Sequence, residues 1–142
     1  AAEMHERIPD VNDGIVSVAG VGIFVTIAAF VGGIVAYSNE LKCALLDVEP
    51  ALIEREGAVS EAVARAMAIG VCRRLGSDLG VSLTGIAGPG GGMPDTPVGT
   101  VWSAWKRRGH YPNAEVFHFD GDREAVRRQT VAVALQGLME LV

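Results

Sequence analysis

The sequence predicts an α/β layered fold with a mixed sheet in a single domain. Segments with the composition of strands alternate with segments of helical periodicity, and one hairpin is inserted among them. A chain of 142 residues has the size of one domain, and no repeat or linker divides it. Apolar residues make up 49% of the chain and charged residues 20%, which is typical of a globular protein.

Residues 14–39 contain no charged side chain, and two interpretations of this run stay open. A segment of this length can cross a membrane as a helix. Its glycines and β-branched residues also fit two buried strands joined by a turn, and we favour the strands. The polar residues 1–13 predict a short helix or a loosely held arm.

The rest of the chain divides into predicted helices and strands. Helices are expected over residues 39–48, 50–56, 61–76 and 123–141. Strands are expected over residues 32–38, 79–85, 99–106 and 114–120, the last two paired as a hairpin. Asn39, Ser60 and either Asp120 or Asp122 are the expected N-caps.

Apolar periodicity in two helices predicts the core. In the helix over 61–76, small residues surround Gly70 and predict close packing, which we expect to be against the sheet. The last helix carries a long apolar stripe that should face the core. The stripe consists of Val126, Val131, Ala134, Leu135, Leu138 and Leu141.

A glycine-rich loop lies between two predicted strands. Residues 83–101, LTGIAGPGGGMPDTPVGTV, hold six glycines and three prolines. Backbone N–H groups of such a loop gather at the carboxyl edge of the sheet, where open α/β sheets bind ligands. The loop therefore predicts an anion cradle or an oxyanion hole, with a purely structural loop as the alternative. It matches neither a Walker loop nor a dinucleotide fingerprint.

Two further motifs hold candidate functional side chains. In AYSNELK, residues 36–42, Tyr37, Ser38 and Lys42 lie within one turn of each other where a strand runs into a helix. Partial burial there would lower the pKa of the lysine and let it act as a general base, with a surface lysine as the alternative. In DGDREAVRR, Arg123 begins a helix, where a guanidinium can reach a phosphate or carboxylate.

Charge and cysteine usage exclude several classes of function. The net charge of −5 gives no basic footprint for nucleic acid, and residues 106–108 are interpreted as a solvated hairpin tip. Cys43 and Cys72 have no metal-binding spacing and suggest a reducing compartment. We therefore expect no metal, no nucleic acid partner and no membrane. The apolar stripe and the glycine-rich run leave surface for a homo-oligomer.

Five motifs, in their order and spacing, closely resemble the CinA C-terminal domain family. They are GGIVAYSNELK, GAVSEAVARAMAIG, TGIAGPGGG, PVGTVW and GDREAVRRQT, and the resemblance covers residues 32–142. It implies a three-layer α/β/α sandwich and a nicotinamide mononucleotide deamidase. This amidohydrolase would form nicotinic acid mononucleotide and ammonia, without a cofactor, in pyridine nucleotide recycling in the cytoplasm. The competence and damage-inducible associations of the family name identify no partner.

The resemblance also implies roles for residues. It implies a serine nucleophile with a lysine as its base, and Lys42 matches the lysine of the family's YSNxxK motif, with Tyr37 and Ser38 beside it. Thr96 stands where the family usually has a lysine, so that charge is absent. The implied substrate-binding residues are Thr84, Gly85, Ile86, Ala87, Gly88, Gly90, Gly91 and Arg123.

The family's nucleophile is the serine of an ESCTGG motif, which this sequence lacks. Residues 1–31 do not match the family pattern, and their one serine, Ser17, is too close to Tyr37. Three explanations are open. The chain binds the nucleotide without hydrolysing it, or residues 1–31 are not the native segment, or Ser38 acts as the nucleophile instead. We favour the second explanation. The alternative function is an inactive nucleotide-binding module of the same fold.

Overall fold

The protein, seen in a computed structural model that describes residues 16–24 and 27–142, is built on a five-stranded sheet. The strands lie in the order β2-β1-β3-β4-β5. They are β1 (Val16–Phe24), β2 (Ile27–Val35), β3 (Leu79–Gly85), β4 (Thr100–Arg107) and β5 (Asn113–His118). Every pair of neighbouring strands is antiparallel. The prediction of a mixed sheet was therefore wrong, because β1 pairs with β2 as an antiparallel hairpin and separates it from β3.

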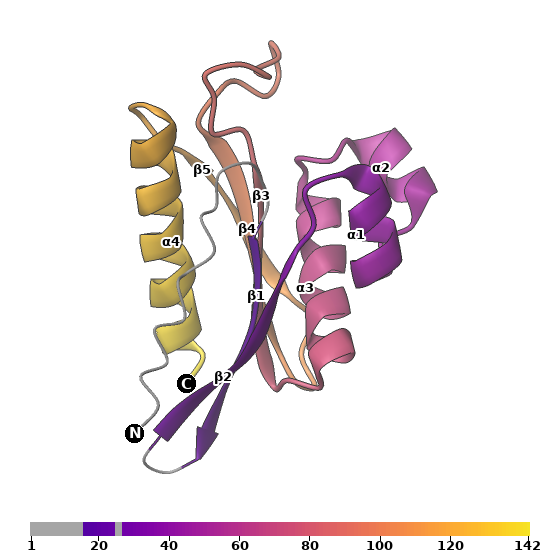
Figure 1. Ribbon diagram of the computed structural model, residues 1–142, viewed down its shortest axis with the longest axis vertical. Helices are drawn as coiled ribbons and strands as arrows, with labels where there is room; N and C mark the ends of the chain where they lie inside the picture. The colour runs from indigo at the N-terminus through magenta and orange to yellow at the C-terminus, as the bar shows by residue number, and fades with distance from the viewer. Residues whose placement is uncertain (1–15, 25–26) are drawn as a thin grey trace.

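Helices cover both faces of the sheet, which confirms the three α/β/α layers (Figure 1). On one face lie α1 (Asn39–Leu46), α2 (Pro50–Glu56) and α3 (Glu61–Leu75), and on the other lies α4 (Arg123–Glu140). Side chains cap three of the helices as N-cap residues, and these are Ser38, Ser60 and Asp122. Ser38 stands where the sequence suggested Asn39, because its hydroxyl accepts the backbone N–H of Leu41.

Within the uncharged run of residues 14–39, residues 16–24 and 27–35 form strands, in favour of the second interpretation. No helix of the described part of the chain is both long and apolar enough to cross a membrane. Residues 30–35 are less buried than the sequence predicted, and the Val31 and Val35 side chains are half exposed, because β2 lies at the edge of the sheet. The arm predicted at residues 1–13 lies outside the described residues.

Among the described residues, two of the three apolar clusters pack helices against the sheet. One joins Ala36 and Leu46 to residues of α3. At its centre, a Cβ on Gly70 would overlap the carbonyl oxygen of Leu46. The close approach is thus between α3 and the end of α1, and not between α3 and the sheet as expected. The other cluster packs β3 and Trp105 of β4 against α4, and the Trp105 indole donates to the carbonyl of Ala134 at 3.0 Å.

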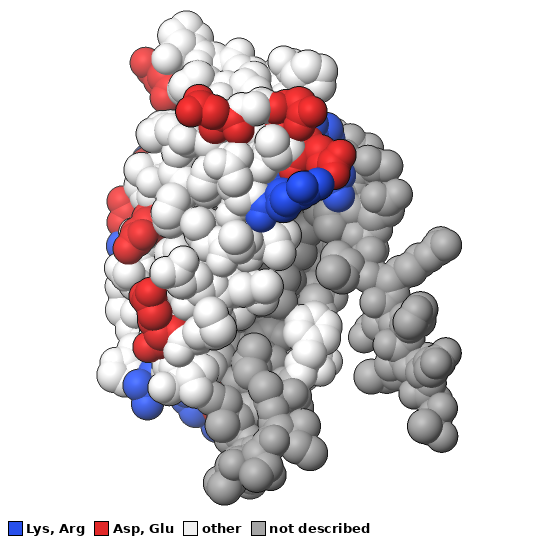
Figure 2. All heavy atoms as spheres, turned by 90° about the vertical axis from the view of Figure 1, so that its left-hand side faces the viewer, with Lys and Arg blue, Asp and Glu red and all other residues white. Residues whose placement is uncertain are grey.

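The apolar stripe predicted on α4 is only partly buried. Val126, Ala134 and Leu138 face the sheet, whereas Val131 is 45% exposed and Leu135 51% exposed. The prediction failed at these two positions because the stripe is wider than the strip of helix that one sheet face can cover. Figure 2 shows this side of the molecule, with a broad uncharged area between the charged side chains.

Gly70→Ala should destabilise the fold, although alanine favours helices. The added methyl has no space beside the Leu46 carbonyl, and such overpacking costs about 1–3 kcal/mol. Urea unfolding measures the change. Gly90→Ala is the matched control, because nothing lies within 4 Å of the place that its methyl group would occupy, and it should leave the free energy of unfolding unchanged. Equal stability of the Gly70 variant and the control would contradict the close approach.

Candidate active site

The sheet topology brings two of the predicted motifs to one edge. Strands β2 and β3 are both antiparallel to β1, so they run in the same direction. The residues that follow them, 36–42 and 86–92, therefore leave the sheet on the same side. This side, where the carboxyl ends of β2 and β3 lie, is the edge meant below and is in the upper part of Figure 1. The start of α4 reaches this edge too, because the Arg123 guanidinium donates to the carbonyl of Gly88 at 2.8 Å.

Lys42 is buried in the fold. Its side chain belongs to the buried face of α1 and the residue is 2% exposed. The Nζ atom donates to Oδ1 of Asn39 at 3.2 Å, which is a neutral acceptor. Burial lowers the pKa of Lys42, and the opposing effects of Cys43 and Glu40 are smaller. A lysine in this state has an increased neutral fraction, which is what a general base requires.

The two neighbours of this motif are placed differently. Ser38 caps α1 through its hydroxyl, and a hydrogen bond between Ser38 and the Glu40 carboxylate lowers the pKa of that carboxyl group. The Lys42 Nζ contacts Asn39 and not Ser38. Tyr37 is 61% exposed at the same edge. The structure thus brings Asn39 to the lysine, a contact that the sequence did not indicate, because Asn39 was expected to cap the helix.

The glycine loop is tied at its base and has free donors further out. The backbone N–H of Ile86 donates to Thr100 at 2.9 Å, and that of Gly99 donates to Ile86 at 2.7 Å. A Cβ on Gly85 would lie 2.8 Å from the Thr100 carbonyl, so only glycine fits there. Within the described residues, no partner is found for five backbone N–H groups. These belong to Ala87, Gly88, Gly90, Gly91 and Gly92.

Two glycines of this loop have conformations that side chains rarely adopt. Gly88 has a φ of 82° and Gly91 a φ of 87°, both in the left-handed region. A Cβ on Gly88 would also lie 2.6 Å from the Val98 side chain. These glycines therefore allow the chain to turn back on itself while its amide groups stay accessible to a ligand, as an anion cradle requires.

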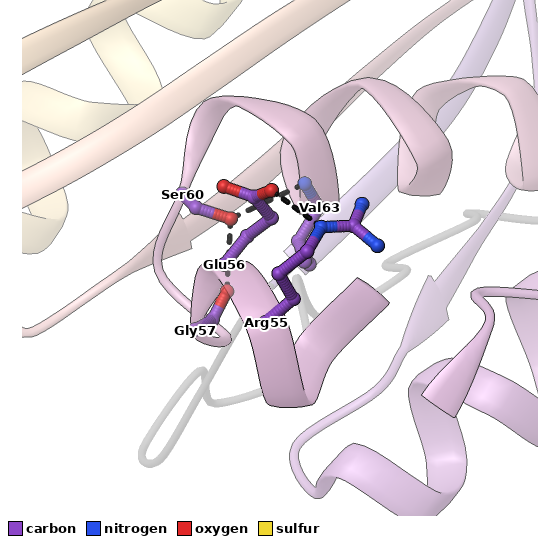
Figure 3. Close-up of polar contacts among 5 residues, drawn as sticks. All are labelled: Arg55, Glu56, Gly57, Ser60 and Val63. Carbon is purple, nitrogen blue, oxygen red and sulfur yellow. Dashed lines mark hydrogen bonds and ion pairs between the residues drawn. The ribbon is translucent and has the colours of Figure 1, made fainter. Parts of the chain in front are cut away.

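Thr84 has a structural contact that the sequence did not suggest. Its side chain is fully buried, and its hydroxyl donates to the carbonyl of Ala58 in the turn between α2 and α3 at 2.6 Å. Figure 3 shows the rest of this turn, where Ser60 donates to the Gly57 carbonyl at 2.8 Å and accepts the N–H of Val63 at 3.3 Å. Thr84 thus links the strand before the loop to the helical layer, and its contact with a substrate stays a prediction.

Arg123 holds the loop from the other side of the sheet. It is half-buried at the first position of α4, after the cap residue Asp122. Its bond to Gly88 fixes one wall of the loop. A guanidinium at this place is also suited to an anionic group of a ligand, and a role in binding a substrate phosphate stays a prediction.

The remaining features lie away from this edge. A cavity of about 340 Å³ is found near the start of β3 and the end of β4, and Cys72, Ser77 and Lys106 are among its lining residues. It is therefore at the opposite edge of the sheet from the candidate site. Among the described residues, no group of three or more His, Cys, Asp or Glu side chains is arranged to bind a metal ion.

Lys42→Met should stabilise the protein at neutral pH. The pKa of Lys42 is below 10.5 in the folded chain and returns to that value on unfolding, so unfolding takes up a proton between the two pKa values. The free energy of unfolding then rises with pH between these two pKa values. Below this range the ammonium is buried in the folded chain, and its full energetic cost is present. Each unit of lowering corresponds to about 1.4 kcal/mol.

Urea unfolding at neutral and at alkaline pH measures this effect. The variant should be more stable than the parent at neutral pH, and the difference should shrink as the pH approaches the pKa of free lysine. Lys106, the one other lysine of the chain, provides the control variant Lys106→Met, which should not stabilise. A destabilised Lys42→Met protein would mean that the ammonium is not buried at a cost.

The comparisons with known proteins agree on one family. The model of the CinA C-terminal domain matches residues 12–142. Nicotinamide-nucleotide amidohydrolase PncC of Pseudomonas putida is 49% identical over 114 residues, which are 80% of this chain and 71% of that protein. A CinA-like protein of Citrifermentans bemidjiense is 51% identical over 111 residues, 78% of this chain but 27% of that protein. The chain thus spans about a quarter of the length of these CinA-like relatives. It covers 27% of the Citrifermentans bemidjiense protein and 25% of the Mycolicibacterium vanbaalenii protein.

Solved structures give the same result for the fold. A CinA superfamily protein of Escherichia coli is similar with a TM-score of 0.71 and 40% identity, over 75% of this chain and 62% of that one. A competence/damage inducible protein of Agrobacterium tumefaciens is similar with a TM-score of 0.71 and 38% identity, over 74% and 64%. The family match starts at residue 12, well before the motifs that begin at residue 32. This chain belongs to the CinA C-terminal domain family.

Proposed function

We propose that this chain is an amidohydrolase that converts nicotinamide mononucleotide to nicotinic acid mononucleotide and ammonia. The observation that carries the proposal is the buried Lys42, whose amine has a neutral partner and a lowered pKa. Buried groups with perturbed pKa values are concentrated at functional sites. The name of the Pseudomonas putida relative, nicotinamide-nucleotide amidohydrolase, supports this choice of substrate.

In this proposal, the neutral amine of Lys42 accepts the proton of the nucleophilic hydroxyl. The hydroxyl oxygen bonds to the carboxamide carbon, and the carbonyl oxygen takes the electron pair as an oxyanion. Donors of the glycine loop stabilise this charge. The lysine then returns the proton to the leaving nitrogen, ammonia departs, and water hydrolyses the acyl-enzyme by the same proton transfers.

Two serines are candidates for the nucleophile. In the strand register, Ser17 of β1 pairs with Ile34 of β2 on one side and with Ser82 of β3 on the other, so its backbone lies near the edge where the motifs meet. Ser38 is closer to Lys42 in sequence, but its hydroxyl caps α1. The proposal therefore ranks Ser17 above Ser38, which reverses the expectation from sequence spacing. Single alanine variants of the two serines distinguish them.

A nucleotide-binding module without catalysis is the second candidate. The absence of the family's ESCTGG motif favours it, because the loop and Lys42 can bind a nucleotide in the absence of a nucleophile.

We also propose that the chain acts in the cytoplasm and associates with itself. The free Cys43 and Cys72 are compatible with a reducing compartment. Self-association would bury the half-exposed Val131 and Leu135 of α4.

Lys42→Ala should strongly lower the rate of amide hydrolysis. The measurement is ammonia release from nicotinamide mononucleotide by the purified protein. Loss of a general base lowers the rate on the order of 10²–10⁴-fold, while the control Lys106→Ala, at the opposite edge, should retain full activity. A rate in Lys42→Ala within about tenfold of the parent rate would contradict the assigned base. Nucleotide binding without any turnover in the parent would favour the binding module.

Arg123→Ala should weaken binding of the phosphorylated substrate selectively. A charge-assisted hydrogen bond contributes about 1.5–3 kcal/mol, so KM for the mononucleotide should rise on the order of tenfold to hundredfold. The KM for the riboside, which lacks the phosphate, should change little. Arg128→Ala, on the exposed face of the same helix, is the control. Equal losses on both substrates would mean that Arg123 acts through its structural contacts, such as the bond to the Gly88 carbonyl, and not through the phosphate.

A further inference from the structure

Asn39 makes one contact that helix formation does not require. It is the first residue of α1, and the capping bond at this end of the helix is supplied by Ser38. Its side-chain amide is therefore available for another role. The Oδ1 atom accepts a hydrogen bond from Nζ of Lys42, three residues later, at 3.2 Å. Residues three apart face the same side of a helix, so the contact needs no distortion of the backbone.

This amide oxygen is the one hydrogen-bond acceptor found for the lysine among the described residues. Two neighbouring groups act on Lys42 electrostatically, without a hydrogen bond to its amine. Glu40 on α1 and the Cys43 thiol each favour the ammonium form of Lys42. At the far end of α1, the carboxylate of Asp47 is paired with Arg73 and Arg74 of α3 at 3.2 and 3.6 Å, so it is neutralised by its own partners.

The chemical type of the partner matters for a base. An amide oxygen accepts one N–H of the amine and carries no net charge, so it orients the nitrogen and favours the protonated amine much less than a carboxylate would. A carboxylate at the same position would attract the ammonium and hold its proton. A neutral amine bound by one N–H still has its lone pair and a second N–H, which are what proton transfer needs.

We propose that Asn39 is a positioning residue that orients the Lys42 amine for proton transfer without placing a charge beside it. This inference rests on the proposed function of Lys42 as the base. It adds a residue to the site that acts through the lysine and need not touch the substrate.

Two substitutions separate this role from a structural one. Asn39→Asp keeps the size of the side chain and adds a negative charge in the first turn of α1, where it favours the helix. Thermal stability should therefore be retained or increased. Asn39→Ala removes the acceptor and adds no charge, and the exposed position of Asn39 makes a folding defect small.

The first readout is the pH profile of amide hydrolysis. In Asn39→Asp the rise of kcat/KM with pH should move to higher pH, with a loss on the order of tenfold at neutral pH and recovery at alkaline pH, since one unit is a tenfold change in the neutral fraction. In Asn39→Ala, kcat should fall on the order of tenfold at all pH values, because an unoriented base is less effective, with KM nearly unchanged. Unchanged profiles in both variants would overturn the proposal.

The second readout does not depend on activity. The chain has two lysines, Lys42 and Lys106, so protein labelled with ¹³C at the lysine Cε gives two side-chain signals that can be titrated by NMR. The Lys42 signal should titrate at higher pH in Asn39→Asp than in the parent, while the Lys106 signal should not move. If the parent has no hydrolase activity but this shift is seen, the proposed function fails and the coupling between Asn39 and Lys42 stands. A Lys42 titration that Asn39→Asp leaves unchanged would overturn the positioning role, whatever the activity.

Discussion

The burial of the Lys42 amine against the amide oxygen of Asn39 is the interaction on which the candidate site depends. Taking an ammonium out of water is costly, and a neutral hydrogen-bond acceptor offsets only part of that cost. Burial in the fold therefore lowers the pKa of Lys42, and a lowered pKa is what the proposed role as a general base requires. A carboxylate partner would stabilise the protein more and would remove this property.

The packing of α1 on α3 keeps the lysine buried. Gly70 lets α3 approach the Leu46 carbonyl, and Asp47 ends α1 in a left-handed conformation with a φ of 55°. The same Asp47 pairs with Arg73 and Arg74 of α3. The end of α1 is thus fixed by steric fit and by charge together, and Lys42 lies one turn before it on the same buried face. The packing that fixes the end of α1 therefore also keeps Lys42 buried, and this burial lowers the pKa of the lysine.

Local patterns in the sequence were enough to predict most helices and strands. Ser60 and Gly76 mark the ends of α3 as caps do in general, and the predicted strand over 79–85 has the bounds of β3. Strand direction was predicted wrongly, because it depends on the pairing of β1 with both β2 and β3, which no local pattern encodes. Contacts between distant elements were also beyond the sequence. The bond of Thr84 to Ala58 and the link of the glycine loop to Arg123 both join residues far apart in the chain.

The motif of residues 36–42 and the glycine loop of residues 86–92 form, on this view, one site at one edge of the sheet. Titrating ¹⁵N-labelled protein with nicotinamide mononucleotide and following the backbone amide signals tests this most directly, since the measurement needs no turnover. We expect the perturbed amides to cluster in these two segments and around Arg123. Perturbations confined to the cavity beside Cys72, Ser77 and Lys106, at the opposite edge, would contradict a shared site.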